Sequence, residues 1–200
     1  MSIQGVVFDF DNTIIKTPTI NLILSPKTAV LWKSVKDTCD HFRGYSAPNL
    51  RALLNKHLQD HHQLEDALYD FDQSALKYCF RKNLIKEVQE LISFLDAYNI
   101  PRAILSDHPC IDKIISLNME AGWSAIINCQ NYNALKPLPY AMFSLAAQLD
   151  LPLSELLFIG DRFDTDGLLS MRHGITFLHI TQLSEAKELI LPSNEQNMLK

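Results

Sequence analysis

Short apolar runs that alternate with helical segments are the feature that most constrains how this chain can fold. Five runs have the length of buried strands, at residues 3–8, 103–105, 125–127, 156–159 and 176–178. Helical patterns separate the later runs, and one of the expected helices begins at Pro109 and continues to about Ala121. Strands that alternate with helices form a parallel sheet with right-handed crossovers. We therefore predict an α/β fold built on a five-stranded parallel sheet.

The segment between the first strand and residue 84 has a different pattern. It contains no strand-like run, and its apolar residues recur at helical spacing in three stripes. The stripes are Leu31, Val35, Cys39 and Phe42; Leu50, Leu53, Leu54 and Leu58; and Leu64, Leu68, Phe71 and Ala75. We expect residues 16–83 to form an all-helical unit inserted into a core made of residues 1–15 and 84–200.

Composition and charge argue against several classes of protein. The formal net charge of −5 gives no general attraction to nucleic acid or to an anionic membrane. No apolar run approaches the roughly 20 residues of a membrane-spanning helix, and the first residues lack the basic leader of a secretory signal. The four cysteines are scattered, as expected of free thiols in a reducing compartment. We expect a cytoplasmic protein, and nothing in the sequence predicts its oligomeric state.

Two carboxylates stand where the first expected strand ends. Asp9 and Asp11 are two residues apart, so an extended backbone points both side chains the same way. Ligands of a parallel sheet bind at the carboxyl ends of its strands. A carboxylate there can attack phosphorus and form an acyl phosphate, and a second one can protonate the leaving oxygen and then deprotonate water. Asp9 is the candidate nucleophile, and Asp11 is the candidate general acid and base.

Four separated segments together resemble the haloacid-dehalogenase superfamily. The stretch from Asp9 to Thr13 resembles its first motif, Asp-x-Asp-x-Thr, and Ser106, Lys136 and Asp161 follow in the order of its later motifs. The resemblance covers residues 3–15 and 84–180. It implies a Rossmann-like core, and the position of the insertion is similar to the small helical cap of subfamily I.

The resemblance also implies a phosphate site. The hydroxyl of Ser106 and the amides of residues 107 and 108 are expected to hold phosphoryl oxygens at the positive end of the following helix. Lys136 is expected to be extended, because a proline follows it, and to neutralise charge on the phosphate and on Asp9. The predicted phosphate site consists of Thr13, Ser106, Asp107 and Lys136.

The cofactor implied by the resemblance is Mg²⁺. In the family the ion is held by the nucleophilic Asp, the backbone carbonyl of the second Asp and an Asp of the fourth motif, which here are Asp9, Asp11 and Asp161. Asp164 and Asp166 are expected to support it. A cation is necessary because the carboxylates would otherwise face a phosphate dianion with only one lysine to oppose them.

Several activities stay open within the resemblance. A phosphatase that acts on a small phosphorylated metabolite is favoured, because a helical cap restricts entry to the site. Dehalogenases of this family do not use the second Asp as acid and base, and phosphonatases lack it, so Asp11 weighs against both. A sugar phosphomutase stays open, as does a phosphate-binding protein that keeps the fold without turnover.

Further polar residues lie near the expected site or in the expected cap. Its helix-entry position favours solvent exposure for His108. Arg162 can meet a phosphate or pair with neighbouring aspartates. Lys16 and the break Arg43-Gly44-Tyr45 between two of the expected cap helices are candidate substrate contacts.

Overall fold

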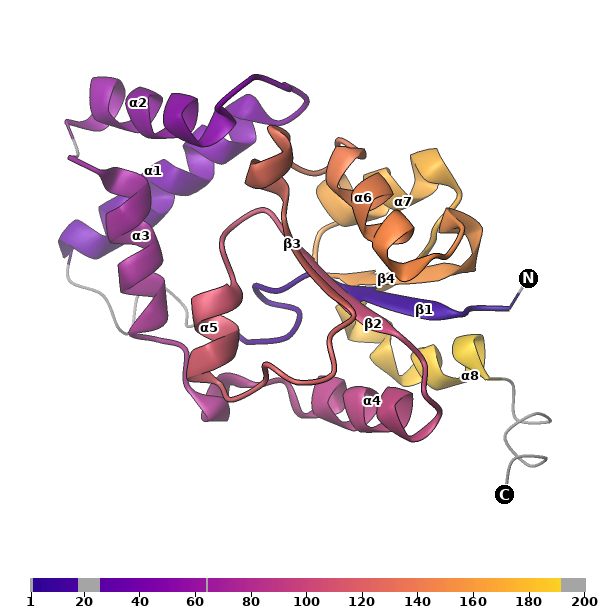
Figure 1. The fold of residues 1–200 in the computed structure, drawn as a ribbon. Helices are drawn as coiled ribbons and strands as arrows, with labels where there is room; N and C mark the ends of the chain where they lie inside the picture. The colour runs from indigo at the N-terminus through magenta and orange to yellow at the C-terminus, as the bar shows by residue number, and fades with distance from the viewer. Residues whose placement is uncertain (1, 18–25, 64, 192–200) are drawn as a thin grey trace.

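A five-stranded parallel sheet forms the centre of the molecule (Figure 1). The structure is a computed structural model that describes residues 2–17, 26–63 and 65–191. The strands are β1 Gly5–Phe8, β2 Arg102–Ser106, β3 Ala125–Asn128, β4 Leu156–Gly160 and β5 Thr176–His179. Their order in the sheet is β3-β2-β1-β4-β5. The predicted α/β class and parallel sheet are confirmed.

Helices cover both faces of the sheet (Figure 1). On one face lie α4 Lys86–Ala97, α5 Ile111–Ser116 and α8 Ala186–Ile190, and on the other lie α6 Tyr140–Leu149 and α7 Leu168–His173. Alternate residues of a strand point to opposite faces, so Val6 and Phe8 of β1 lie in one core and Val7 lies in the other. A strand buried on both faces therefore appears in the sequence as an unbroken apolar run.

Short helical turns complete the core. Four are 3₁₀ turns, namely η2 Arg81–Asn83, η3 Cys129–Tyr132, η4 Leu153–Glu155 and η6 Ile180–Glu185, and η5 Phe163–Gly167 is a π-helical turn. Among the described residues, no helix combines the length and the apolar character needed to cross a membrane.

The helix predicted from Pro109 to Ala121 is wrong in both bounds. The observed helix α5 begins at Ile111 and ends at Ser116. Asn118 has a φ of 52°, a left-handed backbone conformation that ends helices. The glycine that follows four residues later is therefore not what stops this helix.

Three helices form a separate layer beside the carboxyl ends of the strands (Figure 1). They are α1 Pro26–Phe42, α2 Leu50–His62 and α3 Ala67–Leu76. Their shared core contains most of the predicted stripes: Leu31, Val35, Cys39, Leu50, Leu54, Leu58, Leu68 and Phe71. Leu53 is 39% exposed and does not belong to it, and Leu64 lies outside the described residues.

Two adjacent crossings join these helices to the rest of the chain. The amide of Lys16 donates to the carbonyl of Asn83 at 2.7 Å, and the amide of Ile85 donates to the carbonyl of Ile14 at 3.0 Å. The side chain of Lys16 is exposed. We retain residues 16–83 as the proposed cap, with residues 1–15 and 84–200 as the proposed core.

Candidate active site

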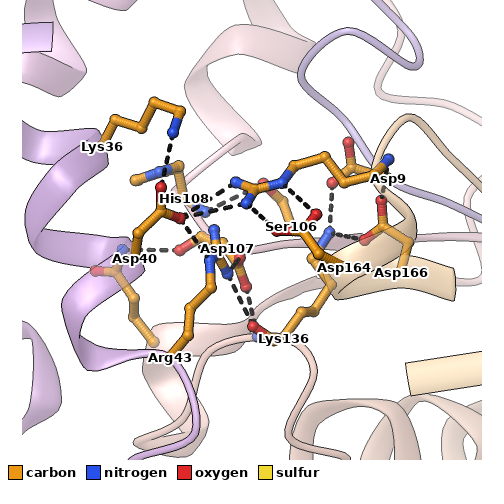
Figure 2. Close-up of polar contacts among 12 residues, drawn as sticks. Asp9, Lys36, Asp40, Arg43, Ser106, Asp107, His108, Lys136, Asp164 and Asp166 are labelled. Atoms are coloured by element: carbon orange, nitrogen blue, oxygen red, sulfur yellow. Dashed lines mark hydrogen bonds and ion pairs between the residues drawn. The ribbon is translucent and has the colours of Figure 1, made fainter. Parts of the chain in front are cut away.

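Asp9 lies at the carboxyl end of β1, in contact with two of the predicted site residues. Its side chain is nearly buried. Lys136 Nζ lies 2.5 Å from Asp9 Oδ1, and the hydroxyl of Thr13 donates to Asp9 Oδ2 at 3.2 Å. Lys136 is 3% exposed and comes from the segment between η3 and α6 (Figure 2). The fold thus brings the candidate nucleophile and the candidate phosphate-binding lysine together.

Three carboxylates gather beside this lysine. One oxygen from each of Asp9, Asp161 and Asp166 lies within 4.8 Å of the others. Asp161 directly follows β4, and Asp166 returns to the same place from η5, with Oδ1 at 2.8 Å from Lys136 Nζ. Gly160 leaves the necessary space, because a Cβ atom there would lie 2.8 Å from the Cβ of Asp166. Of the two aspartates expected to support a metal, Asp166 is the one that joins this carboxylate cluster.

Asp164 instead lies at the surface, in a set of ion pairs that links the cap to the core (Figure 2). Arg162 donates to Asp164 at 3.0 Å and to Asp40 of α1 at 3.3 Å. Arg43, which follows α1, contacts Asp40 at 2.8 Å and Asp107 at 2.6 Å. Of the two roles predicted for Arg162, contact with phosphate or pairing with aspartates, the structure shows the pairing with aspartates.

Charge in the carboxylate cluster is unbalanced. Burial raises the pKa of Asp9 well above its ordinary value, and although Lys136 opposes the shift, Asp166 adds to it. Burial and Asp166 also raise the pKa of Asp161. Burial alone would lower the pKa of Lys136, but the neighbouring carboxylates outweigh burial and raise it. In the part of the chain that the structure describes, Lys136 is the only cation that forms an ion pair with these three acids.

The donor set of this cluster fits a hard divalent cation. Mg²⁺ prefers oxygen ligands and takes one or two carboxylates together with water and phosphate oxygens. Asp166 Oδ1 is buried and makes no hydrogen bond, although Lys136 lies close to it. A cation among Asp9, Asp161 and Asp166 would also relieve the mutual repulsion that raises the pKa of Asp9 and of Asp161. Asp9 and Asp161 are the side chains that would hold the ion, and Asp166 lies beside them as the support that the resemblance implies.

Asp11 is held by a lysine that the motifs did not predict. Lys113 of α5 donates to both carboxylate oxygens of Asp11, at 2.9 and 3.0 Å, and is itself 3% exposed. Burial would raise the pKa of Asp11, but Lys113 and His108 outweigh it, so the pKa is lowered. Helix α5 is too short for a periodic pattern, which is why the sequence carries no clear signal for Lys113.

The helix expected to begin at the phosphate site begins further along the chain, so its first turn does not include the amides predicted to bind phosphate. Because α5 starts at Ile111, the amides of residues 107 and 108 precede its first turn. Ser106 is buried at the end of β2, and its hydroxyl accepts a hydrogen bond from the amide of His108 at 3.2 Å. Asp107 Oδ1 accepts a hydrogen bond from the amide of Lys136 at 2.9 Å. Ser106 thus fixes the turn after β2, and Asp107 joins that turn to the segment that carries Lys136. Their contact with phosphate stays a prediction.

The expectation that His108 is exposed to solvent is wrong. Its Nδ1 atom is buried without a hydrogen-bond partner, and its ring lies 5.1 Å from the ring of Phe71 in α3. Burial lowers the pKa of His108. The cap is the reason, because α3 packs against α5 and covers the loop that carries this histidine.

Two hollows lie between the cap and the core. A groove of about 690 Å³ runs between α2, α3 and η3, with Arg51, Tyr69 and Asn131 among its walls. A much smaller cavity of about 10 Å³ includes Asp11 and Lys113. Only the small cavity therefore contains a residue of the predicted catalytic pair.

Comparison with known proteins identifies one family and one fold. The family model for haloacid dehalogenase-like hydrolases matches residues 3–168. No curated protein matches the chain. The solved structures that resemble it share little sequence, so their likeness shows the fold alone.

Three of these structures show the range of activities among proteins with this fold. A putative hydrolase of the family from Bacillus subtilis, bound to magnesium, has a TM-score of 0.66 at 15% identity and covers 95% of this chain and 99% of its own. A phosphatase of the family from Thermococcus onnurineus has a TM-score of 0.63 at 15% identity, and the match covers 94% of this chain and 98% of the phosphatase. The L-2-haloacid dehalogenase RSc1362 has a TM-score of 0.64 at 16% identity, and the match covers 88% of this chain and 86% of the dehalogenase.

Proposed function

The chain belongs to the haloacid dehalogenase-like hydrolases, and from that membership we propose that it is a magnesium-dependent phosphatase. Its substrate is a small phosphomonoester, and the reaction passes through a phosphoryl group carried by Asp9. The observation that carries this proposal is the contact of Asp9 with Lys136 inside a cluster of three carboxylates.

Two displacement steps follow from these side chains. A carboxylate oxygen of Asp9 attacks phosphorus, the bond from phosphorus to the leaving oxygen breaks, and Asp11 in its protonated form gives that oxygen a proton. Water then attacks the phosphorus of the aspartyl phosphate, Asp11 takes the proton, and inorganic phosphate leaves as Asp9 is restored. The lowered pKa of Asp11 favours its ionised form, which suits this second step, in which Asp11 accepts a proton, and opposes the first step, in which Asp11 must be protonated.

Positive charge supports both steps. Lys136 stabilises negative charge on the phosphoryl oxygens and on Asp9. Asp9 and Asp161, with Asp166 beside them, would hold Mg²⁺, which would supply the further charge that lets a carboxylate approach a phosphate dianion. The raised pKa of Asp161 is consistent with this assignment, since it reflects burial and repulsion by Asp166, and a bound cation would offset that repulsion.

Asp11 supports a phosphatase rather than a dehalogenase. Dehalogenases of the family do not use a second aspartate as acid and base, whereas here Asp11 is present and fixed by a buried lysine. A phosphomutase would keep both aspartates. It would differ in its product, which would be an isomeric sugar phosphate instead of inorganic phosphate.

Phosphate release from acetyl phosphate and p-nitrophenyl phosphate tests the proposal. We expect turnover with Mg²⁺, its loss in excess EDTA and its return when Mg²⁺ is restored. Asp9→Asn should abolish it, whereas Asp164→Asn, which alters an exposed carboxylate outside the cluster, should not. Full turnover in EDTA would refute the metal requirement. Halide release from 2-chloropropionate without any phosphatase activity would instead make the protein a dehalogenase.

A further inference from the structure

The imidazole of His179 contacts the main chain of the loop that carries two of the clustered carboxylates. His179 is the last residue of β5, and in the sheet it lies beside Gly160, the last residue of β4. Its Nε2 atom lies 2.9 Å from the carbonyl oxygen of Asp161, the residue after Gly160. A side chain of the edge strand thus reaches the backbone of a proposed metal ligand.

Contacts with Thr181 decide which nitrogen of the neutral imidazole carries the hydrogen. The backbone amide of Thr181 donates to Nδ1 of His179 at 3.3 Å, and the hydroxyl of Thr181 lies 2.8 Å from the same atom. A backbone amide can only donate, so Nδ1 is the acceptor and the hydrogen is on Nε2. The Nε2–H group of His179 therefore donates to the carbonyl of Asp161.

The peptide group that joins Asp161 to Arg162 is held on both sides. Its carbonyl accepts the hydrogen bond from His179, and its N–H donates to Asp166 Oδ2 at 3.3 Å. Because a peptide group is planar, fixing the direction of the carbonyl also fixes the direction of the N–H. One hydrogen bond from His179 therefore orients the backbone of Asp161 and, through the amide of Arg162, the carboxylate of Asp166.

An aromatic residue of the same loop holds the imidazole in place. Phe163, the first residue of η5, stacks on His179 with the two ring planes 3° apart and the centroids 4.8 Å apart. Its ring also packs edge-on against Phe177 of β5, with the centroids 5.3 Å apart. Phe163 is nevertheless 65% exposed, so these ring contacts, and not deep burial, fix its position. His179 is thus joined to the loop by a ring contact as well as by a hydrogen bond.

We propose that His179 is a positioning residue for the Mg²⁺ site, and that its Nε2–H holds Asp161 and Asp166 in the arrangement that receives the ion. The carboxylates of this cluster lie within 4.8 Å of one another, so their repulsion favours an arrangement in which they separate. The hydrogen bond from His179 opposes that separation before the ion arrives. This inference rests on the proposed function, because it needs the Mg²⁺ site that the proposal assigns.

Calorimetric titration of the purified protein with MgCl₂ tests the role of the N–H group. His179→Gln and His179→Met introduce side chains of similar length, and only glutamine offers an N–H to the carbonyl of Asp161. His179→Met should weaken Mg²⁺ binding roughly tenfold or more, whereas His179→Gln should stay within about threefold of the wild type. His173→Met is the matched control, because the ring of His173 in α7 contacts Phe143, and it should leave the affinity unchanged.

The outcomes separate the positioning role from the metal site itself. Both variants of His179 lose the ring contact with Phe163, so a purely structural role would lower their Tm in EDTA alike and give them the same Mg²⁺ affinity. Equal affinities in the glutamine and methionine variants, or equal weakening in His173→Met, would overturn the proposal and leave the metal site standing. If the wild type does not bind Mg²⁺, the metal requirement of the proposed function fails, and the positioning role fails with it. His179→Phe, which keeps a ring beside Phe163 and lacks the N–H, replaces His179→Met if melting shows that the methionine variant does not fold.

Discussion

Replacing Asp161 by asparagine should stabilise the metal-free protein while it abolishes activity. Asp161 forms no ion pair among the described residues, yet its carboxylate lies within 4.8 Å of those of Asp9 and Asp166. Two unit charges at that distance repel each other by about 3 kcal/mol at an effective dielectric constant of about 20. Burial raises the pKa of Asp9 to about 8, so near neutral pH the repulsion comes mainly from Asp166. Because Asp161 is partly exposed, solvent screens these repulsions. We expect the free energy of unfolding to rise by about 1–3 kcal/mol.

This gain should depend on pH. Burial and Asp166 raise the pKa of Asp161 above its ordinary value of 3.8, so the folded protein holds this proton more tightly than the unfolded chain does. The wild type therefore loses stability as the pH rises from about 4 through the raised pKa. The advantage of Asp161→Asn should be full at a pH above the raised pKa of Asp161 and should shrink as the pH falls toward about 4.

Thermal unfolding in EDTA and in Mg²⁺ measures the effect. For a chain of this size a gain of about 1–3 kcal/mol corresponds to a rise in Tm of about 2–10 °C in EDTA. Mg²⁺ should raise the Tm of the wild type but not that of the variant. Asp164→Asn is the matched control, and it should cost at most about 1 kcal/mol because its ion pair with Arg162 is exposed. If Asp161→Asn melts below the wild type in EDTA, or if Mg²⁺ stabilises both equally, the reasoning about the carboxylate cluster is wrong.

Three further substitutions should have effects that the structure determines. Lys136→Met should lower the free energy of unfolding by roughly 3–5 kcal/mol, because two buried aspartates lose their cation; an unchanged denaturant midpoint in EDTA would contradict this. Gly160→Ala should weaken Mg²⁺ binding roughly tenfold or more by displacing Asp166, and wild-type affinity in calorimetry would rule that out. Arg43→Met should lower the free energy of unfolding by roughly 1–3 kcal/mol, because the buried carboxylate of Asp107 loses its ion pair with Arg43. An unaltered melting curve would show that this ion pair contributes nothing.

The parts of the fold that could be predicted are those whose cause is local. The central strands β1, β2 and β4 are buried on both faces, so they appear as largely apolar runs. Because β1 and β4 are parallel neighbours, the residues that follow them must lie at one edge of the sheet. Asp9 and Asp161 could therefore be assigned to one site from sequence alone. The cap helices could be predicted because their apolar residues repeat at helical spacing.

The rest depends on contacts between distant segments. Asp164 and Asp166 are equivalent in the sequence, and only the π-helical turn η5, together with the absent side chain of Gly160, brings Asp166 to the cluster. The pairing of Asp11 with Lys113 joins residues 102 positions apart, and no motif marks it. His108 is only half-exposed because the cap packs against its ring, which its own neighbours in the chain do not reveal.

The identity of the residue that carries phosphate is the measurement that bears most directly on this account. Asp11→Asn enzyme, mixed with Mg²⁺ and acetyl phosphate, can still transfer a phosphoryl group, because acetate leaves without needing a proton, but it lacks the base that activates water. After an acid quench and digestion, mass spectrometry should find phosphate on the peptide at Asp9, and none in the double variant that also carries Asp9→Asn. Phosphate attached to another side chain, or undiminished turnover by an enzyme without Asp9, would contradict the account.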